Sequence, residues 1–246
     1  MVNRRSSCTA SRTIRRPRSP SLPSSAVADV NVVAPWLRGY APSPTAGPFD
    51  MAALTSDMHA LIDRWSPGRA VELVGHDWGG AITYDACVTA PERIERAVTL
   101  AFPHPLTFLS RPRLAQLRRS WYMGLFQLPG SGWMVTARDL ALIDHLWRQW
   151  SPSLSLDPAL QAELHEHLRA SMPAPLKYYP AMLRPGMLGA TRRLSQPIAV
   201  PLLQLHGADD GCILPQTERI FSKLLHVLSS CCPLCRRQHC LADSAM

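Results

Sequence analysis

Asp77 stands at the centre of a glycine-flanked segment whose residue types could carry out nucleophilic catalysis. Residues 71–80 read VELVGHDWGG, with an apolar strand expected over 70–74 and a helix expected over 81–90. Small residues two positions before and two after a reactive side chain are typical of a nucleophile elbow, a sharp strand-to-helix turn. The sequence therefore predicts Asp77 as a nucleophile and the backbone N–H of Trp78 as a donor to developing negative charge. The alternative is an ordinary glycine-rich turn in which the aspartate caps the helix.

Aspartate at this position, where serine is more common, narrows the chemistry. A carboxylate attacks amides poorly, but it can displace a leaving group from an sp³ carbon and so form an ester with the protein. Water must then hydrolyse that ester, which requires a general base and an acidic residue that orients the base. A histidine and a second carboxylate are therefore expected elsewhere in the chain.

Asp210 is the predicted acid. It follows a strand expected over 198–205, lies in a Gly-Ala-Asp-Asp turn and comes after the nucleophile in the chain, which is the order typical of such sites. Asp209 is the alternative acid. A structural aspartate that caps the next helix is the other alternative for Asp210.

The predicted base is His239, which lies 29 residues after Asp210. No strand is expected before His239 and no glycine stands beside it, so a residue of an unstructured tail is the alternative. His226 falls within a helix expected over 216–228. His76 stands beside the nucleophile, but its side chain is expected to point away from that of Asp77. His104 and His206 are interpreted as local structural histidines rather than bases.

Strands and helices alternate along the first part of the chain, which predicts an α/β fold with a mostly parallel sheet flanked by helices. Helical patterns then dominate over 105–195 before a strand pattern returns, so this block is predicted to be a helical cap inserted over the site. The expected strands cover 30–35, 70–74, 97–101 and 198–205, and the expected helices cover 51–65, 81–90, 114–128, 137–150, 158–171, 175–183 and 216–228.

Both ends of the chain are predicted to be unstructured tails around a core formed by 30–104 and 196–228. Residues 1–29 are rich in Arg, Ser and Pro, and residues 229–246 are rich in cysteine. The net charge is +8, but six arginines of the first tail account for most of it, so nucleic-acid binding is not expected. No run approaches about 18 apolar residues, so no membrane span is expected. An organelle transit peptide is an alternative for the first tail.

The chain has seven cysteines and no apolar signal segment, which favours free thiols in a reducing compartment and predicts a cytoplasmic location. Cys232, Cys235, His239 and Cys240 could be read as zinc ligands. Their cramped spacing and the lack of a second ligand pair favour a tail without metal. Neither a metal nor a cofactor is therefore expected.

Five segments of the chain resemble the α/β-hydrolase-fold epoxide hydrolases, a family near the haloalkane and haloacetate dehalogenases. The resemblance covers roughly residues 30–228. The matching segments are 34–40 (APWLRGY), 75–80 (GHDWGG), 102–105 (FPHP), 119–123 (RSWYM) with 126–129 (FQLP), and 205–210 (LHGADD).

This resemblance implies Asp77 as nucleophile, Asp210 as the acid and a helical cap above them. It also implies that two cap tyrosines hydrogen-bond the epoxide oxygen, and Tyr122 and Tyr179 match them. A phenol with a pKa of about 10 can donate to a developing alkoxide without being charged. Tyr178 competes with Tyr179 for the second position, and core packing is the alternative role for all three tyrosines.

Both ends depart from the family's pattern. Residues 1–29 lack the His-Gly-x-Pro segment that supplies a second oxyanion donor in the family, and the cysteine-rich tail stands in place of the family's final strand and helix. The early strands and the last strand of the sheet are therefore expected to be missing, as in a truncated or divergent chain.

The predicted function is the hydrolysis of a small-molecule epoxide to a diol. A haloalkane or haloacetate dehalogenase with the same nucleophile is the alternative within this class, although a halide needs a second donor beside Trp78 and the sequence offers no convincing one. A catalytically inactive hydrolase-like remnant is the alternative from a different class. The missing oxyanion segment and the surroundings of His239 favour it, whereas the elbow, the acid and the cap tyrosines favour an enzyme.

Overall fold

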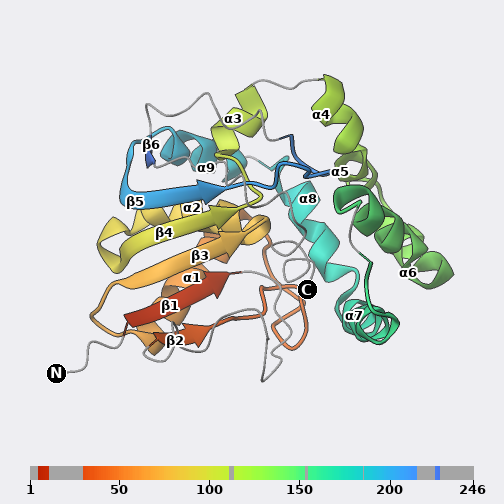
Figure 1. Ribbon diagram of the computed structural model, residues 1–246, viewed down its shortest axis with the longest axis horizontal. Helices are drawn as coiled ribbons and strands as arrows, with labels where there is room; N and C mark the ends of the chain where they lie inside the picture. Colours follow the sequence, from red (N-terminus) through yellow and green to blue (C-terminus); the bar gives the residue numbers. More distant parts are fainter. Residues whose placement is uncertain are drawn as a thin grey trace.

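A six-stranded parallel sheet forms the centre of the protein, as the computed structural model shows for residues 5–10, 30–110, 114–152, 155–184, 186–214 and 225–227 (Figure 1). The strand order is β2-β1-β3-β4-β5-β6, and every neighbouring pair is parallel. The strands are β1 Arg5–Ala10, β2 Val30–Val33, β3 Val71–His76, β4 Ile94–Leu100, β5 Ile198–Leu205 and β6 Leu225–Val227.

Three helices pack against one another on one face of the sheet: α1 Met51–Trp65, α2 Trp78–Thr89 and α9 Gly186–Leu194 (Figure 1). Asp50 caps α1, since its side chain accepts a hydrogen bond from the Ala53 N–H at 3.0 Å. The short helix η1 Pro91–Arg93 joins α2 to β4. Parallel strands joined by such helical crossovers are buried on the helix-covered face, which explains the apolar strand sequences.

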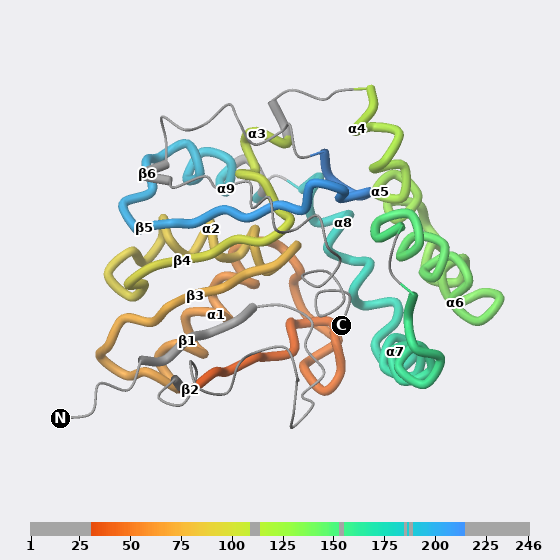
Figure 2. Tube along the Cα trace, viewed as in Figure 1, coloured from red at the N-terminus to blue at the C-terminus, as the bar shows by residue number. Residues whose placement is uncertain are grey.

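The remaining helices form a cap that lies beyond the carboxyl ends of the strands (Figures 1 and 2). α3 Pro105–Ser110 leads into it from β4. The cap helices are α4 Leu114–Arg119, α5 Trp121–Leu125, α6 Ser131–Trp150, α7 Pro158–Ser171, η2 Ala174–Lys177 and α8 Tyr178–Ala181. A break at residues 137–140 divides α6 into two helical parts. The α/β-hydrolase-like architecture expected from the sequence is therefore confirmed.

Two predictions about the ends of the sheet are wrong. No strand was expected in residues 1–29, yet β1 lies between β2 and β3 and pairs with both. A helix was expected over 216–228, yet β6 at Leu225–Val227 extends the sheet beyond β5. β1 (RSSCTA) has no apolar alternation, and β6 (LHV) is too short for its alternation to mark a strand. Both join the sheet through backbone pairing with neighbours that are distant in sequence.

No helix among the described residues is long and apolar enough to cross a membrane.

Candidate active site

Asp77 occupies the turn between β3 and α2 in a backbone conformation that L-residues rarely adopt. Its φ is 52° and its ψ is −119°. Its backbone N–H donates to the carbonyl oxygen of Leu100 at 3.2 Å, which ties the turn to β4. A residue in such a region costs about 1–3 kcal/mol and persists only where its surroundings enforce it. The turn therefore holds the carboxylate in a fixed place at the carboxyl end of the sheet.

Two glycines allow α2 to lie close to its neighbours: Gly75 permits the close approach to β3, and Gly80 permits the close approach to Phe102 after β4. A Cβ atom at Gly75 would lie 2.2 Å from the carbonyl oxygen of Gly79 and 2.3 Å from Oγ1 of Thr83. A Cβ atom at Gly80 would lie 2.9 Å from the Cβ of Phe102. Any larger residue would therefore push the helix away from the sheet.

We expect Gly75→Ala to destabilise the protein by about 3 kcal/mol, because the added methyl group overlaps the α2 backbone. Urea denaturation measures this change in the free energy of unfolding. Gly124→Ala is the matched control, since a Cβ atom there meets nothing within 4 Å. Unchanged stability of Gly75→Ala would contradict the close approach of strand and helix.

Asp77 faces a cavity of about 70 Å³ between the sheet and the cap. Among the described residues that line it, Asp77 is the only acidic side chain, and none is basic. Such a cavity favours an uncharged, apolar molecule next to a single carboxylate. Its other lining residues are aromatic or aliphatic: Met51, Trp78, Ala81, Phe102, Pro105, Phe108, Tyr122, Met123, Tyr179, Met182, Ala190, Leu194 and Ile213.

Tyr122 and Tyr179 both line this cavity, whereas Tyr178 does not. The rings of Tyr122 and Tyr179 meet edge to face with centroids 6.0 Å apart, and the Tyr179 ring lies 5.7 Å from that of Trp78. Tyr178 is buried and its hydroxyl donates to the backbone carbonyl of Arg38. Of the two adjacent tyrosines, Tyr179 therefore shares the cavity with Asp77 and Tyr178 joins α8 to the loop after β2.

Burial raises the pKa of the Tyr122 phenol well above its usual value, and the nearby Cys212, Tyr179 and Asp77 raise it further. The phenol therefore stays protonated and can act as a hydrogen-bond donor. Its hydroxyl oxygen lies 3.3 Å from Sγ of Cys212. Sulfur is a weak partner, so this contact leaves the hydroxyl group able to bind a stronger acceptor in the cavity.

Asp210 is buried in the turn that follows β5, whereas Asp209 is exposed. Its Oδ1 accepts hydrogen bonds from the N–H groups of Cys212 at 2.7 Å and Ile213 at 3.0 Å. Its Oδ2 lies 3.1 Å from Nε2 of His206. These bonds hold the Asp210 carboxylate, and not that of Asp209, in a defined inward position.

His206 and Cys212 are two neighbours of Asp210 that the motifs did not assign to the site. His206 is buried, and its Nε2 also lies 3.0 Å from the carbonyl oxygen of Ile213. Burial raises the pKa of the Cys212 thiol, and the charges of Asp210 and Asp77 contribute to that shift. Cys212 therefore lies within electrostatic reach of both carboxylates. The only sequence signal for either residue is its distance of two to four positions from Asp210.

No histidine among the described residues lines the cavity. His239, the predicted base, lies outside the described residues. His104 is buried, and burial lowers its pKa to about 4, so its imidazole is neutral near pH 7. Its ring packs edge to face on Tyr84 with centroids 5.0 Å apart. His226 belongs to β6 rather than to a helix.

Known proteins share both the fold and part of this sequence. The family model for the alpha/beta hydrolase fold matches residues 17–130. Epoxide hydrolase 4 of Mus musculus is 33% identical over 134 residues, which are 51% of this chain and 36% of that protein. The crystal structure of a Bacillus megaterium epoxide hydrolase superposes with a TM-score of 0.70 at 18% identity, covering 93% of this chain and 84% of that one. This chain has the alpha/beta hydrolase fold, and about half of it is similar in sequence to epoxide hydrolase 4.

The segments that align with this chain make up only part of the length of its curated relatives. An AB hydrolase superfamily protein of Bacillus subtilis is 34% identical over 107 residues, or 37% of its own length. The matched segments thus span little more than a third of the length of each of these two curated relatives. The epoxide hydrolase structure from Vigna radiata superposes with a TM-score of 0.64 at 20% identity, which concerns the fold.

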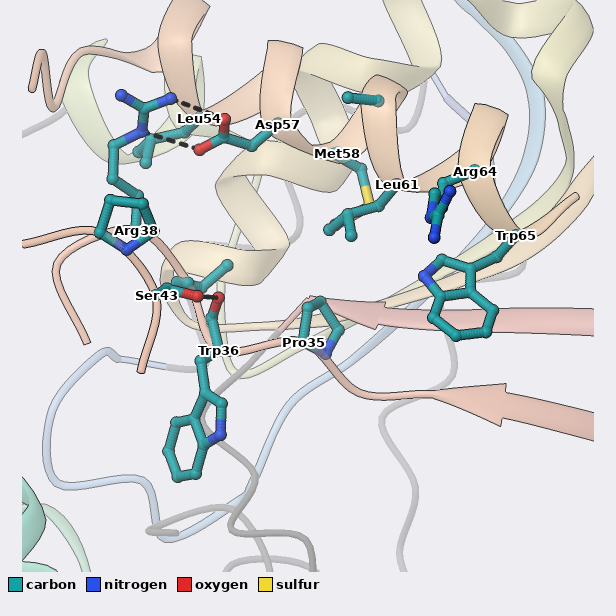
Figure 3. A pocket seen from close by; sticks show the side chains of 13 residues that line it. Pro35, Trp36, Arg38, Ser43, Leu54, Asp57, Met58, Leu61, Arg64 and Trp65 are labelled. Carbon is teal, nitrogen blue, oxygen red and sulfur yellow. Dashed lines mark hydrogen bonds and ion pairs between the residues drawn. The ribbon is translucent and has the colours of Figure 1, made fainter. Parts of the chain in front are cut away.

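The protein has a second and larger hollow, of about 450 Å³, between α1 and the loop after β2 (Figure 3). Arg38 and Asp57 form an ion pair at 2.6 Å there, and the Ser43 hydroxyl donates to the carbonyl of Trp36 at 2.7 Å. The hollow contains neither the elbow nor the cap tyrosines, so it is not the candidate active site.

Within the described residues, no group of three or more His, Cys, Asp or Glu side chains is arranged to hold a metal ion. The four terminal residues considered as zinc ligands, Cys232, Cys235, His239 and Cys240, lie outside the described residues.

Proposed function

We propose that this α/β hydrolase opens an epoxide to a diol through an ester on Asp77. The observation that carries this proposal is the shared cavity: one carboxylate on a strained turn faces two phenols, Tyr122 and Tyr179, among apolar walls. A carboxylate and two neutral donors match the two needs of epoxide opening, attack at carbon and protonation at oxygen.

In the first step an Asp77 oxygen forms a bond to an epoxide carbon while the epoxide C–O bond breaks. The released oxygen takes a proton from the Tyr122 or Tyr179 hydroxyl, which leaves a tyrosinate that regains its proton from solvent. In the second step water attacks the ester carbonyl of Asp77, and the backbone N–H of Trp78 at the start of α2 stabilises the oxyanion. His239, oriented by Asp210, accepts the proton from that water and returns it to the alkoxide oxygen that leaves as the intermediate collapses, which releases the diol. The Asp77 carboxyl then loses its proton to solvent and regains the starting carboxylate.

The lining of the cavity supports the epoxide over the halogenated substrates. Haloacetate carries a carboxylate and needs a cation, whereas none of the described lining residues is basic. A neutral haloalkane remains the second candidate, because Trp78 could donate to a halide. Product analysis with an aryl epoxide and a haloalkane of equal size separates the two functions.

A catalytically inactive relative is the proposal's main competitor, since residues 1–29 lack the His-Gly-x-Pro segment. Loss of one oxyanion donor costs about 10²–10³ in rate, so slow turnover is expected rather than none. Incubation with an aryl epoxide and detection of the diol by chromatography tests the proposal. Absence of both diol and an Asp77 adduct would overturn it.

The proposed compartment is the cytoplasm. The thiols of Cys87 and Cys212 are free, which supports a reducing environment.

We expect Tyr122→Phe and Tyr179→Phe each to slow ring opening about 100-fold, because each variant loses a donor to the oxygen that develops charge. Hydrolysis of the ester does not need the phenols and should change little. Rapid-mixing kinetics with mass detection of the Asp77 ester separates the two steps.

Tyr178→Phe is the matched control for these variants, since Tyr178 donates to the Arg38 carbonyl and does not line the cavity. Its ring-opening rate should equal that of the wild type. A normal alkylation rate in the Tyr122/Tyr179 double variant would assign both tyrosines to packing.

A further inference from the structure

One face of the cap binds directly to the turn that carries Asp210. The buried Gln116 side chain uses both of its polar atoms: its Nε2 donates to the carbonyl of Cys212 at 3.0 Å, and its Oε1 accepts from the N–H of Leu214 at 2.9 Å. Arg119, one helical turn later in α4, donates from Nη1 to the carbonyl of Asp210 itself at 2.7 Å. Two side chains of one helix thus hold three backbone groups of residues 210–214, a segment here called the acid turn after the proposed role of Asp210.

Tyr122 continues the same face of the cap. It follows Arg119 by three residues, as Arg119 follows Gln116, and its hydroxyl contacts the side chain of Cys212 in the same turn. The phenol proposed to bind the epoxide oxygen and the carboxylate proposed to orient the base are therefore attached to one another through residues 210–214.

The end of α6 holds the acid turn from a second side. The backbone N–H of Gly211 donates to the carbonyl of Trp150 at 3.0 Å. A Cβ atom at Gly211 would lie 1.9 Å from the carbonyl oxygen of Gln149, so the two backbones are in direct contact. The turn is thus enclosed by two cap helices that are far from it in sequence.

We propose that Gln116 and Arg119 are positioning residues. Their hydrogen bonds to residues 210–214, here called the clamp, fix the positions of Asp210 and Tyr122 relative to each other when the cap packs on the sheet. This inference rests on the proposed function, because it assigns ring opening and ester hydrolysis to parts held by one clamp. Among the described residues, Asp210 Oδ1 accepts hydrogen bonds from Cys212 and Ile213 of its own turn, and Oδ2 lies 3.1 Å from Nε2 of His206 just after β5. Loss of the Gln116 and Arg119 bonds therefore frees the backbone of this turn on the side of α4 while its internal bonds remain. Release of the clamp would also expose the Cys212 thiol.

The accessibility of Cys212 tests the clamp without reference to turnover. Wild type, Gln116→Leu, Arg119→Met and Arg119→Lys are treated with iodoacetamide, and the labelling rate of each cysteine is measured by peptide mass spectrometry. We expect Cys212 to label about tenfold faster in Gln116→Leu and Arg119→Met. Each variant loses hydrogen bonding to the acid turn, so the free energy needed to open this turn locally falls and the open, reactive state is more populated. In Arg119→Lys the ammonium group can still donate to the Asp210 carbonyl, so Cys212 should label at close to the wild-type rate.

Two internal controls accompany the labelling. Arg118 is exposed and makes no bond to the acid turn, so Arg118→Met removes a neighbouring cation without touching the clamp. Cys87 is buried in α2 and reports global unfolding. If Gln116→Leu unfolds, Cys87 labels as well, and the Arg119→Met and Arg119→Lys pair then decides the outcome.

The kinetic arm uses an aryl epoxide and measures kcat and KM of the same variants. We expect kcat to fall about tenfold in Gln116→Leu and Arg119→Met with little change in KM, and to recover in Arg119→Lys, because misplacement of catalytic groups acts on the chemical steps. Unchanged Cys212 labelling in Arg119→Met would overturn the clamp, and so would a loss of kcat without faster labelling. Faster Cys212 labelling in Arg119→Met, together with a wild type that shows no epoxide chemistry, would keep the clamp and reject the proposed function.

Discussion

Asp77→Ala is expected to abolish both diol formation and the covalent adduct with an epoxide. Asp77 is the only carboxylate among the described residues that line the cavity, so no other described group there can attack the epoxide carbon. Removal of a covalent nucleophile lowers kcat by about 10⁴-fold or more. Asp77→Asn should behave alike, because the amide keeps the shape of the side chain but is a far weaker nucleophile. Diol chromatography and intact-protein mass spectrometry measure the two products.

Asp209→Ala is the matched control for the loss of Asp77. Asp209 is an exposed aspartate, and its removal should leave turnover within about twofold, as surface substitutions usually do. Retained turnover in Asp77→Ala would remove Asp77 from the mechanism. An equal loss in Asp209→Ala would exchange the proposed roles of Asp209 and Asp210.

His239→Gln is expected to turn the protein into a single-turnover trap. Alkylation of Asp77 does not need a base, whereas hydrolysis of the ester does, and loss of a general base slows that step by about 10²–10⁴. Protein incubated with excess epoxide should then accumulate a stable adduct of one substrate mass on Asp77, which peptide mass spectrometry locates.

His145→Gln serves as the control for this variant, because His145 is an exposed histidine of α6. It should turn over at the wild-type rate and carry no adduct at the end of the reaction. Rapid turnover of His239→Gln would show that another group activates the water. A stable adduct already present on the wild type would favour the alternative of a site that alkylates without a working base.

Much of the secondary structure follows from local patterns. The helix expected over 51–65 is α1, the helix expected over 158–171 is α7 and the strand expected over 198–205 is β5. α1 begins at Met51 after the capping residue Asp50, and α7 begins at Pro158 after the capping residue Asp157. Such signals act between residues a few positions apart, so they are visible without the fold.

The elbow was also visible in the sequence, since its glycines and its strand-helix context lie within ten residues. The choice between identical adjacent residues rested on motif position and on the resemblance, which favoured Tyr179 and Asp210 without a local physical signal. Tyr178 and Tyr179 have the same side chain, and only the packing of α8 sends one to the Arg38 carbonyl and the other into the cavity with Asp77. The burial of Asp210 beside an exposed Asp209 was likewise set by the turn.

Amino-acid order alone thus predicted the α/β architecture, which the structure confirms, and it predicted the turn at Asp77, Asp210 as the acid and a helical cap. Tertiary structure decided which side chains meet, because those contacts join residues with little local signal. β1 lacks an apolar pattern and enters the sheet through backbone pairing with β2 and β3. Gln116 and Arg119 reach the acid turn across more than ninety residues, and no periodicity of three or four residues reports a contact over such a distance.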